Sequence, residues 1–250
     1  MKNLVTCLAR AAVACTLAAP LSPTLAAESC SVQSGPTRTP VIELYTSEGC
    51  SSCPPADKWL STLKPVGADN GAVIQAFHVG YWDYIGWVDR FASPAHTIRQ
   101  RKIAAINRQD SIYTPQAVLN GRDWRDWGHL PSSKEPAGAS IAIRQVAADR
   151  FEALVTPTAG AVGIWSAYWS VTEHGHSSKV KSGENAGAFL QHDFVVRQYT
   201  PVGDYPLDAK APQKLTWRSI TATPGHPRQI NLVVFNPRTG NTLQAVSASC

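Results

Sequence analysis

The chain has 250 residues, of which 23 are basic and 18 acidic, so its formal net charge is +5. This excess is too small to indicate binding to a nucleic acid or to an anionic membrane surface, and we expect neither as a partner. Past the N-terminus no segment is long and apolar enough to cross a bilayer, so no stable membrane insertion is expected.

The N-terminus predicts an export signal. Lys2 and Arg10 are the only charged residues before Glu28, and Ala, Leu and Val dominate the stretch between them and the cleavage region. Small residues there fit cleavage after Ala26 or Ala27. A membrane anchor is the alternative, but the apolar run is short and is broken by two prolines. Removal of the leader lowers the net charge to +3, because it takes two basic residues and no acidic one.

Four cysteines remain in the mature chain: Cys30, Cys50, Cys53 and Cys250. An exported protein can hold them as disulfides, and four cysteines allow three pairings. Cys50 and Cys53 are the locally favoured pair, which leaves Cys30 and Cys250 for a structural disulfide between the two ends of the chain. The chain-entropy model assigns about 4–5 kcal/mol to so long a loop.

The first half of the mature chain predicts alternating strands and helices. Residues 41–46 and 73–79 are apolar and β-branched, as in buried strands. Between them a helix begins at or just before Cys53, because the two prolines that follow this cysteine fit only a first turn. Ser93 and Pro94 predict the capped start of a helix that ends near residue 107.

Further along, an aromatic stretch at 80–87 precedes that helix. Residues 112–121 predict a strand that a proline opens and an Asn-Gly pair ends, which is a strong hairpin signal. Residues 122–135 predict a loop and residues 137–148 a helix.

After residue 150 the pattern changes to strands, predicted at 151–156, 162–172, 189–199, 214–222, 230–235 and 242–247. The expected organisation is a leader (1–27), a first domain with the cysteine pair (28–149) and a β-rich domain packed on it (150–250).

The Cys50–Cys53 pair has the setting of a redox centre. A thiolate at the start of a helix faces unpaired N–H groups and the positive end of the helix dipole, so its pKa should fall. Two intervening residues place both sulfurs within disulfide reach. Glu48 adds a negative charge nearby and should oppose thiolate formation.

The order strand, C-x-x-C at a helix start, strand, helix, then Thr-Pro opening a hairpin resembles the thioredoxin fold. That resemblance implies an α/β, thioredoxin-like fold with an additional β-rich C-terminal region. It also implies that Cys50 is the nucleophile, Cys53 the resolving thiol, and Pro115 a cis proline after Thr114. By the same resemblance Glu43, on the preceding strand, is a possible proton relay; the alternative is a carboxylate that faces solvent.

Four longer runs resemble an exported bacterial family catalogued as domain of unknown function 1223: TSEGCSSCPPAD, FHVGYWDYIGWVDRFASP, YTPQAVLNGR and SGENAGAFLQHDFVVR. This resemblance covers nearly the whole mature chain and implies a periplasmic or secreted protein with a thioredoxin-like fold. It implies no substrate. The last run includes Gly183-Glu184-Asn185 and His192, for which an ion-paired turn is a sufficient explanation.

The aromatic stretch supplies candidates for a substrate groove beside the dithiol, namely Tyr81, Trp82 and Trp87, together with Thr114. The alternative is that these rings belong to the core, because Trp and Tyr are largely buried on average.

The function that we expect is a thiol–disulfide oxidoreductase that forms a mixed disulfide at Cys50, with exported protein thiols or disulfides, or small thiols, as partners. No organic cofactor and no metal is expected. Two alternatives stay open: a non-catalytic binding module with a structural disulfide, and a copper-handling protein in which Cys50, Cys53 and a histidine such as His78 hold the metal.

Overall fold

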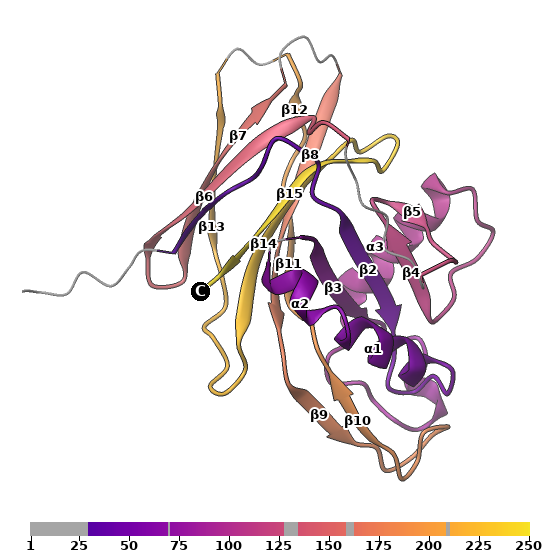
Figure 1. Ribbon diagram of the computed structural model, residues 1–250. Coiled ribbons are helices and arrows are strands. Elements are labelled where there is room, and N and C mark those ends of the chain that lie inside the picture. The colour runs from indigo at the N-terminus through magenta and orange to yellow at the C-terminus, as the bar shows by residue number, and fades with distance from the viewer. Residues whose placement is uncertain (1–29, 70, 128–134, 159–162, 209–210) are drawn as a thin grey trace, which may run out of the picture.

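The computed structural model describes residues 30–69, 71–127, 135–158, 163–208 and 211–250 (Figure 1). Strands hold 43% of the residues and helices 14%, in several sheets. The protein is therefore β-rich, and the predicted thioredoxin-like α/β fold is wrong. The predicted leader lies outside the described residues.

A nine-stranded sheet forms the centre of the molecule and runs in the order β15-β14-β8-β11-β3-β2-β4-β5, with β12 paired to β8. Strands from both halves of the sequence therefore belong to one sheet. The pairs β2–β3 and β3–β11 are parallel, and the other pairs are antiparallel. Its strands are β2 (Val41–Thr46), β3 (Val73–His78), β4 (Gln116–Leu119), β5 (Arg122–Asp123), β8 (Ile164–Glu173), β11 (Val195–Pro201), β12 (Tyr205–Pro206), β14 (Arg228–Phe235) and β15 (Thr242–Ser249).

The other strands form two smaller sheets. A four-stranded sheet has the order β1-β6-β7-β13, and β9 and β10 form a separate hairpin. Their bounds are β1 (Ser31–Gln33), β6 (Ala139–Ala147), β7 (Arg150–Pro157), β9 (His176–Lys179), β10 (Phe189–His192) and β13 (Gln213–Arg218).

The helix predicted at 137–148 is wrong, because these residues form strand β6. Its first residues alternate between buried and exposed, with Ala139, Ile141 and Ile143 pointing inward. This period of two belongs to a strand with one buried face. The strand predicted at 189–199 is two strands, β10 and β11, separated at Phe194, which has a positive φ of 56°.

The helices lie on the two faces of the large sheet. Helices α1 (Cys53–Ser61) and α2 (Lys64–Ala68) contact Ile42 and Ile74 on one face. Helix α3 (Pro94–Ile106) packs on the opposite face through Ile103, in the same cluster as Val41. A short 3-10 helix, η1, precedes it at Asp83–Ile85.

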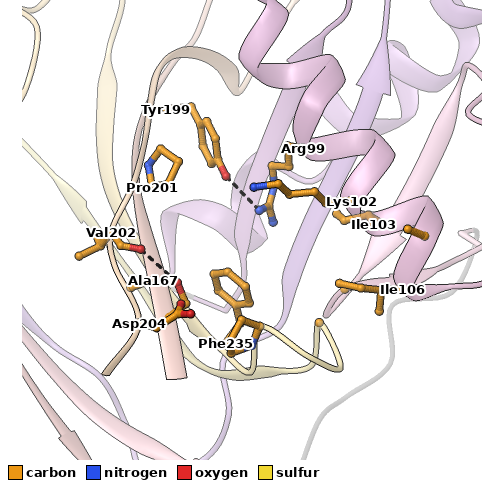
Figure 2. A pocket seen from close by; sticks show the side chains of 15 residues that line it. Arg99, Lys102, Ile103, Ile106, Ala167, Tyr199, Pro201, Val202, Asp204 and Phe235 are labelled. Atoms are coloured by element: carbon orange, nitrogen blue, oxygen red, sulfur yellow. Dashed lines mark hydrogen bonds between the residues drawn. The ribbon is translucent and has the colours of Figure 1, made fainter. Parts of the chain in front are cut away.

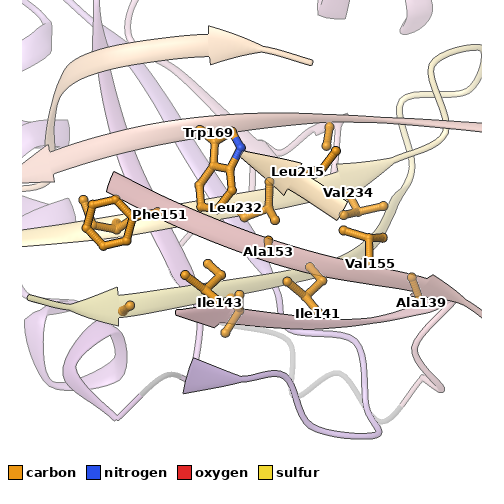
Figure 3. Close-up of a cluster of buried hydrophobic side chains, with 14 of the residues drawn as sticks. Ala139, Ile141, Ile143, Phe151, Ala153, Val155, Trp169, Leu215, Leu232 and Val234 are labelled. Atoms are coloured by element: carbon orange, nitrogen blue, oxygen red, sulfur yellow. The ribbon is translucent and has the colours of Figure 1, made fainter. Parts of the chain in front are cut away.

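The four-stranded sheet covers the remaining part of the face that carries α1. Its inward side chains, such as Ile141 and Phe151, meet Trp169, Leu232 and Val234 of the large sheet (Figure 3). Because the two sheets share this β-sandwich core, the β-rich part of the chain is not an addition to a separate α/β domain core. The predicted division at residue 149 stays a prediction.

Cys30 and Cys250 form a disulfide that joins the two ends of the described chain. No helix in the described residues is long and apolar enough to span a membrane.

Candidate functional site

The cysteine pair lies where β2 turns into α1. Strand β2 ends at Thr46, and the turn is closed by two backbone hydrogen bonds, from Cys50 N–H to the Ser47 carbonyl and from Cys53 N–H to the Cys50 carbonyl, both 3.2 Å. The helix then starts at Cys53 with two prolines in its first turn, as predicted. Both cysteines are free thiols and buried, with 1% of Cys50 and 0% of Cys53 exposed.

The two thiols differ strongly in acidity. A hydrogen bond from Cys53 lowers the pKa of Cys50 to about 6, against the opposing effect of burial, and the hydroxyls of Ser52 and Thr114 add to this lowering. The Ser52 hydroxyl lies 3.3 Å from the Cys50 sulfur. Burial raises the pKa of Cys53, and the hydrogen bond with Cys50 raises it further. Cys50 is thus the thiol that ionises first.

The segment before β4 lies directly against this dithiol. The Thr114–Pro115 peptide bond is cis, which is the predicted isomer. Thr114 accepts a 2.7 Å hydrogen bond from Trp82 Nε1. Tyr81 is also close: burial raises its pKa to about 12, and the charges of Cys53 and Cys50 contribute.

Trp87, the third aromatic candidate, binds a carboxylate. Its Nε1–H donates to Glu48 Oε2 over 2.7 Å. The structure therefore brings the predicted groove residues to the cysteine site, but as half-buried side chains that hold the site together. Their role in substrate binding stays a prediction.

Glu48 belongs to a buried ionic network that the sequence analysis did not predict. Its Oε1 lies 3.2 Å from Nε2 of His192, whose Nδ1 lies 3.4 Å from Oδ2 of Asp57 on α1. Thr46 donates to the same Asp57 oxygen over 3.2 Å. Burial opposes a charge on His192, but hydrogen bonds with Asp57 and Glu48 outweigh it and raise the pKa of His192 to about 9.

Asp89 extends this network beneath the cysteine turn. Its Oδ2 accepts the Glu48 N–H at 3.0 Å and lies 2.7 Å from His78 Nδ1. Although burial opposes the charge, the interaction with His78 keeps the pKa of Asp89 low. Glu48 is thus compensated by partners, and its carboxylate does not act as an isolated charge beside Cys50.

Glu43 lies away from the cysteines. It shares the sheet face of Val41 and Tyr45, which is the face of α3, whereas Cys53 begins α1 on the other face. Both of its carboxylate oxygens bind Arg99, and Tyr45 donates to Oε2 over 2.7 Å. The buried carboxylates near the cysteines are Glu48, Asp57 and Asp89 instead.

A segment between β9 and β10, residues 180–188, covers the cysteine turn. Asn185 Nδ2 donates to the carbonyls of Glu48 and Cys50, at 2.8 and 3.0 Å, and the Glu184 carboxylate accepts the Ser51 N–H at 3.0 Å. These bonds fasten two parts of the chain that are more than 130 residues apart.

The sequence analysis missed Asp57 and Asp89, and it noted Asn185 and His192 only as part of an ion-paired turn, without their contacts to the cysteine turn and to Glu48. For Asp57 a signal exists, because its spacing from Cys53 places both on one face of α1. The other three approach through tertiary contacts and have no local signal.

The copper alternative required Cys50, Cys53 and a histidine such as His78. His78 uses Nδ1 on Asp89, and among the described residues no group of three or more His, Cys, Asp or Glu side chains is arranged to hold a metal ion.

Comparisons with known proteins give a family and a fold. The family described as "Protein of unknown function (DUF1223)" matches residues 41–235. The crystal structure of protein AGR_C_4864 from Agrobacterium tumefaciens is similar, with a TM-score of 0.59 and 23% identity over 86% of this chain and 95% of that chain. HBP35 of Porphyromonas gingivalis has a TM-score of 0.52 and 11% identity over 85% of this chain and 75% of that one. No curated protein matches. At these identities the two structures show the fold alone.

Proposed function

The chain belongs to the DUF1223 family of proteins of unknown function, and we propose that it is an exported thiol–disulfide oxidoreductase whose reactive group is the Cys50–Cys53 dithiol. The observation that carries the proposal is the asymmetry of the two thiols. The pKa of Cys50 falls to about 6 while that of its neighbour rises. A thiolate is the nucleophile in exchange, and a pKa near the ambient pH favours its attack.

The reaction proceeds in two exchanges. The Cys50 thiolate attacks one sulfur of a substrate disulfide, that S–S bond breaks, and the leaving thiolate takes up a proton. Cys53 then loses its proton and attacks the Cys50 sulfur, which forms the Cys50–Cys53 disulfide and releases the second substrate thiolate. The protein dithiol loses two electrons and the substrate disulfide gains them; the reverse sequence oxidises a substrate dithiol.

The burial of Cys50 limits the access of a substrate to its sulfur. Because only 1% of Cys50 is exposed, we infer that residues packed around the cysteine turn move before a substrate sulfur reaches it, and segment 180–188, which Asn185 fastens to this turn, is the candidate. The proposed partners are exported protein thiols or disulfides, or small thiols. Export is supported by the composition of the leader and by the Cys30–Cys250 disulfide, since disulfides persist outside the reducing cytoplasm.

The test uses oxidised glutathione as a probe. The reduced Cys53→Ser variant should accumulate a mixed disulfide at Cys50, because the resolving thiol is gone. The matched Cys50→Ser variant should form none, since the pKa of Cys53 is raised. Mass spectrometry of intact protein reads the adduct, and the rate of iodoacetamide alkylation of Cys50 against pH in the reduced wild-type protein, which keeps the Cys53 hydrogen bond, should show an apparent pKa of about 6.

Two results contradict the proposal. One is the absence of an adduct in Cys53→Ser together with an unshifted alkylation profile. The other is a wild-type dithiol potential below about −300 mV, which is typical of a structural disulfide and favours the binding-module alternative.

A further inference from the structure

A cavity of about 490 Å³ lies between α3, strands β8 and β11 and the turn that joins β14 to β15 (Figure 2). None of its lining residues belongs to the cysteine site. The volume is in the range of small-molecule sites. Most of the lining is apolar, and Figure 2 shows these side chains around the opening: Ile103, Ile106, Ala167, Pro201, Val202 and Phe235.

One end of this cavity carries positive charge. Arg99 reaches it, but its charge is matched by Glu43, which binds two of its nitrogens. Lys102 follows on the same helix and extends toward the Arg99–Tyr199 hydrogen bond (Figure 2). In the described part of the chain no ion pair involves Lys102. Glu43 thus matches the charge of Arg99, whereas the exposed Lys102 leaves one positive charge at this end of the cavity for a ligand.

Tyr199 adds a hydrogen-bond donor at the same end. Its oxygen accepts from Arg99 NH1 at 3.4 Å, so the hydroxyl hydrogen is left to donate to another acceptor. A lysine ammonium and a phenol O–H together fit the two oxygens of a carboxylate. Asp204 lines another part of the cavity and disfavours a second negative charge there.

From this arrangement we propose that the cavity binds a small monocarboxylate with an apolar body, such as an arylalkanoate. Its carboxylate meets Lys102 and the Tyr199 hydroxyl, and its hydrocarbon part packs on Ile103, Ile106 and Phe235. The site is independent of the dithiol chemistry proposed above.

The test compares phenylbutyrate with phenylbutanol, which keeps the ring and chain but lacks the charge. Isothermal titration or ligand-observed NMR on the full mature chain should show that the acid binds at least about tenfold more tightly than the alcohol. Lys102→Met should reduce the affinity for the acid by about tenfold and leave the alcohol unchanged.

The matched control is Arg101→Met, which removes a positive charge from the neighbouring position, outside the lining of this cavity. It should change binding of the acid by less than about twofold. Ala105 is an exposed lining residue, so Ala105→Trp should fill the opening without disturbing the core and should weaken both probes. Circular dichroism checks that each variant is folded.

The proposal is overturned if the wild-type protein binds no phenylbutyrate at millimolar concentration. It is equally overturned if acid and alcohol bind alike, or if Arg101→Met weakens the acid as much as Lys102→Met does, because the charge contact would then be non-specific.

Discussion

At the scale of single residues, the chemistry of the site depends on partners that approach from elsewhere in the chain. Glu48 by itself should oppose a thiolate at Cys50, yet Trp87 and His192 both bind its carboxylate. His192 in turn is held between two carboxylates, those of Glu48 and Asp57, in a buried position. Because the pKa of His192 is raised on folding, protonation of this imidazole also stabilises the folded state.

The Glu48–His192–Asp57 network should stabilise the protein in a pH-dependent way. The pKa of His192 is about 9 in the folded chain against 6.5 ordinarily. Its contribution is complete below pH 6.5 and is lost as the pH rises through about 9. His192→Gln should cost about 3 kcal/mol at the acidic end of this window and much less at the alkaline end, measured by urea unfolding at several pH values.

Cys50 acts in the opposite sense, because its lowered pKa gives stability that grows over the same interval as the pH rises. The comparison is therefore made in a Cys50→Ser background. His226→Gln is the control, since this imidazole contacts the backbone carbonyl of His174 and stacks on the His176 ring, and within the described residues it forms no ion pair with a carboxylate. An equal cost of His192→Gln across the whole pH range would refute the ionic role.

At the scale of elements, the turn of the hairpin β4–β5 is predicted by its local sequence and is also packed against a distant part of the chain. Asn120 and Gly121 form its turn with positive φ angles of 50° and 80°, as the Asn-Gly pair predicts. The same glycine lies against the β14–β15 turn: a Cβ there would be 2.0 Å from the Gly240 carbonyl oxygen. Asn107, at the end of α3, donates to the Gly121 carbonyl at 2.9 Å.

Gly121→Ala should therefore lower the free energy of unfolding by more than the positive φ alone would. The φ by itself costs about 1–3 kcal/mol, and the clash adds to this loss. The backbone of the other turn has to move to admit the methyl group. Thermal or urea unfolding measures the loss. Gly225→Ala is the matched control, because its φ is also 80° and nothing lies within 4 Å of a Cβ there; a loss of the same size in both variants would contradict the proposed contact.

At the scale of the whole molecule, the large sheet and the β-sandwich bring the chain ends together. Strand β1, which follows Cys30, pairs with β6, and β15, which precedes Cys250, lies at the edge of the nine-stranded sheet. The disulfide between them has a sequence separation of 220 residues. It therefore restricts the unfolded chain over nearly its whole described length.

Replacing both cysteines by serine, in Cys30→Ser/Cys250→Ser, should lower the free energy of unfolding by about 4–5 kcal/mol in the chain-entropy model. Denaturant unfolding of the oxidised proteins measures the difference. Cys50→Ser/Cys53→Ser controls for the loss of two sulfurs without the loss of this crosslink. Equal stabilities of the crosslinked and uncrosslinked chains would show that the bond does not contribute.

The sequence by itself determined the features that depend on neighbours along the chain. The strand before Cys50, the helix that begins at Cys53 and the Asn-Gly hairpin all follow from residue types at fixed short spacings, whereas the cis bond before Pro115 was implied by the resemblance to thioredoxins. The β-strands after residue 150 were also largely predictable, because a period of two is local as well.

Only the tertiary structure decided the fold class, since strand pairing is not local: the strand-forming residues of β8 or β14 are compatible with a separate domain and with the single nine-stranded sheet that they join. The same holds for the site. Glu43 lies beside Arg99 because its position on β2 directs it to the face that α3 covers, whereas the turn after β2 and helix α1 bring Glu48 and Asp57 to His192.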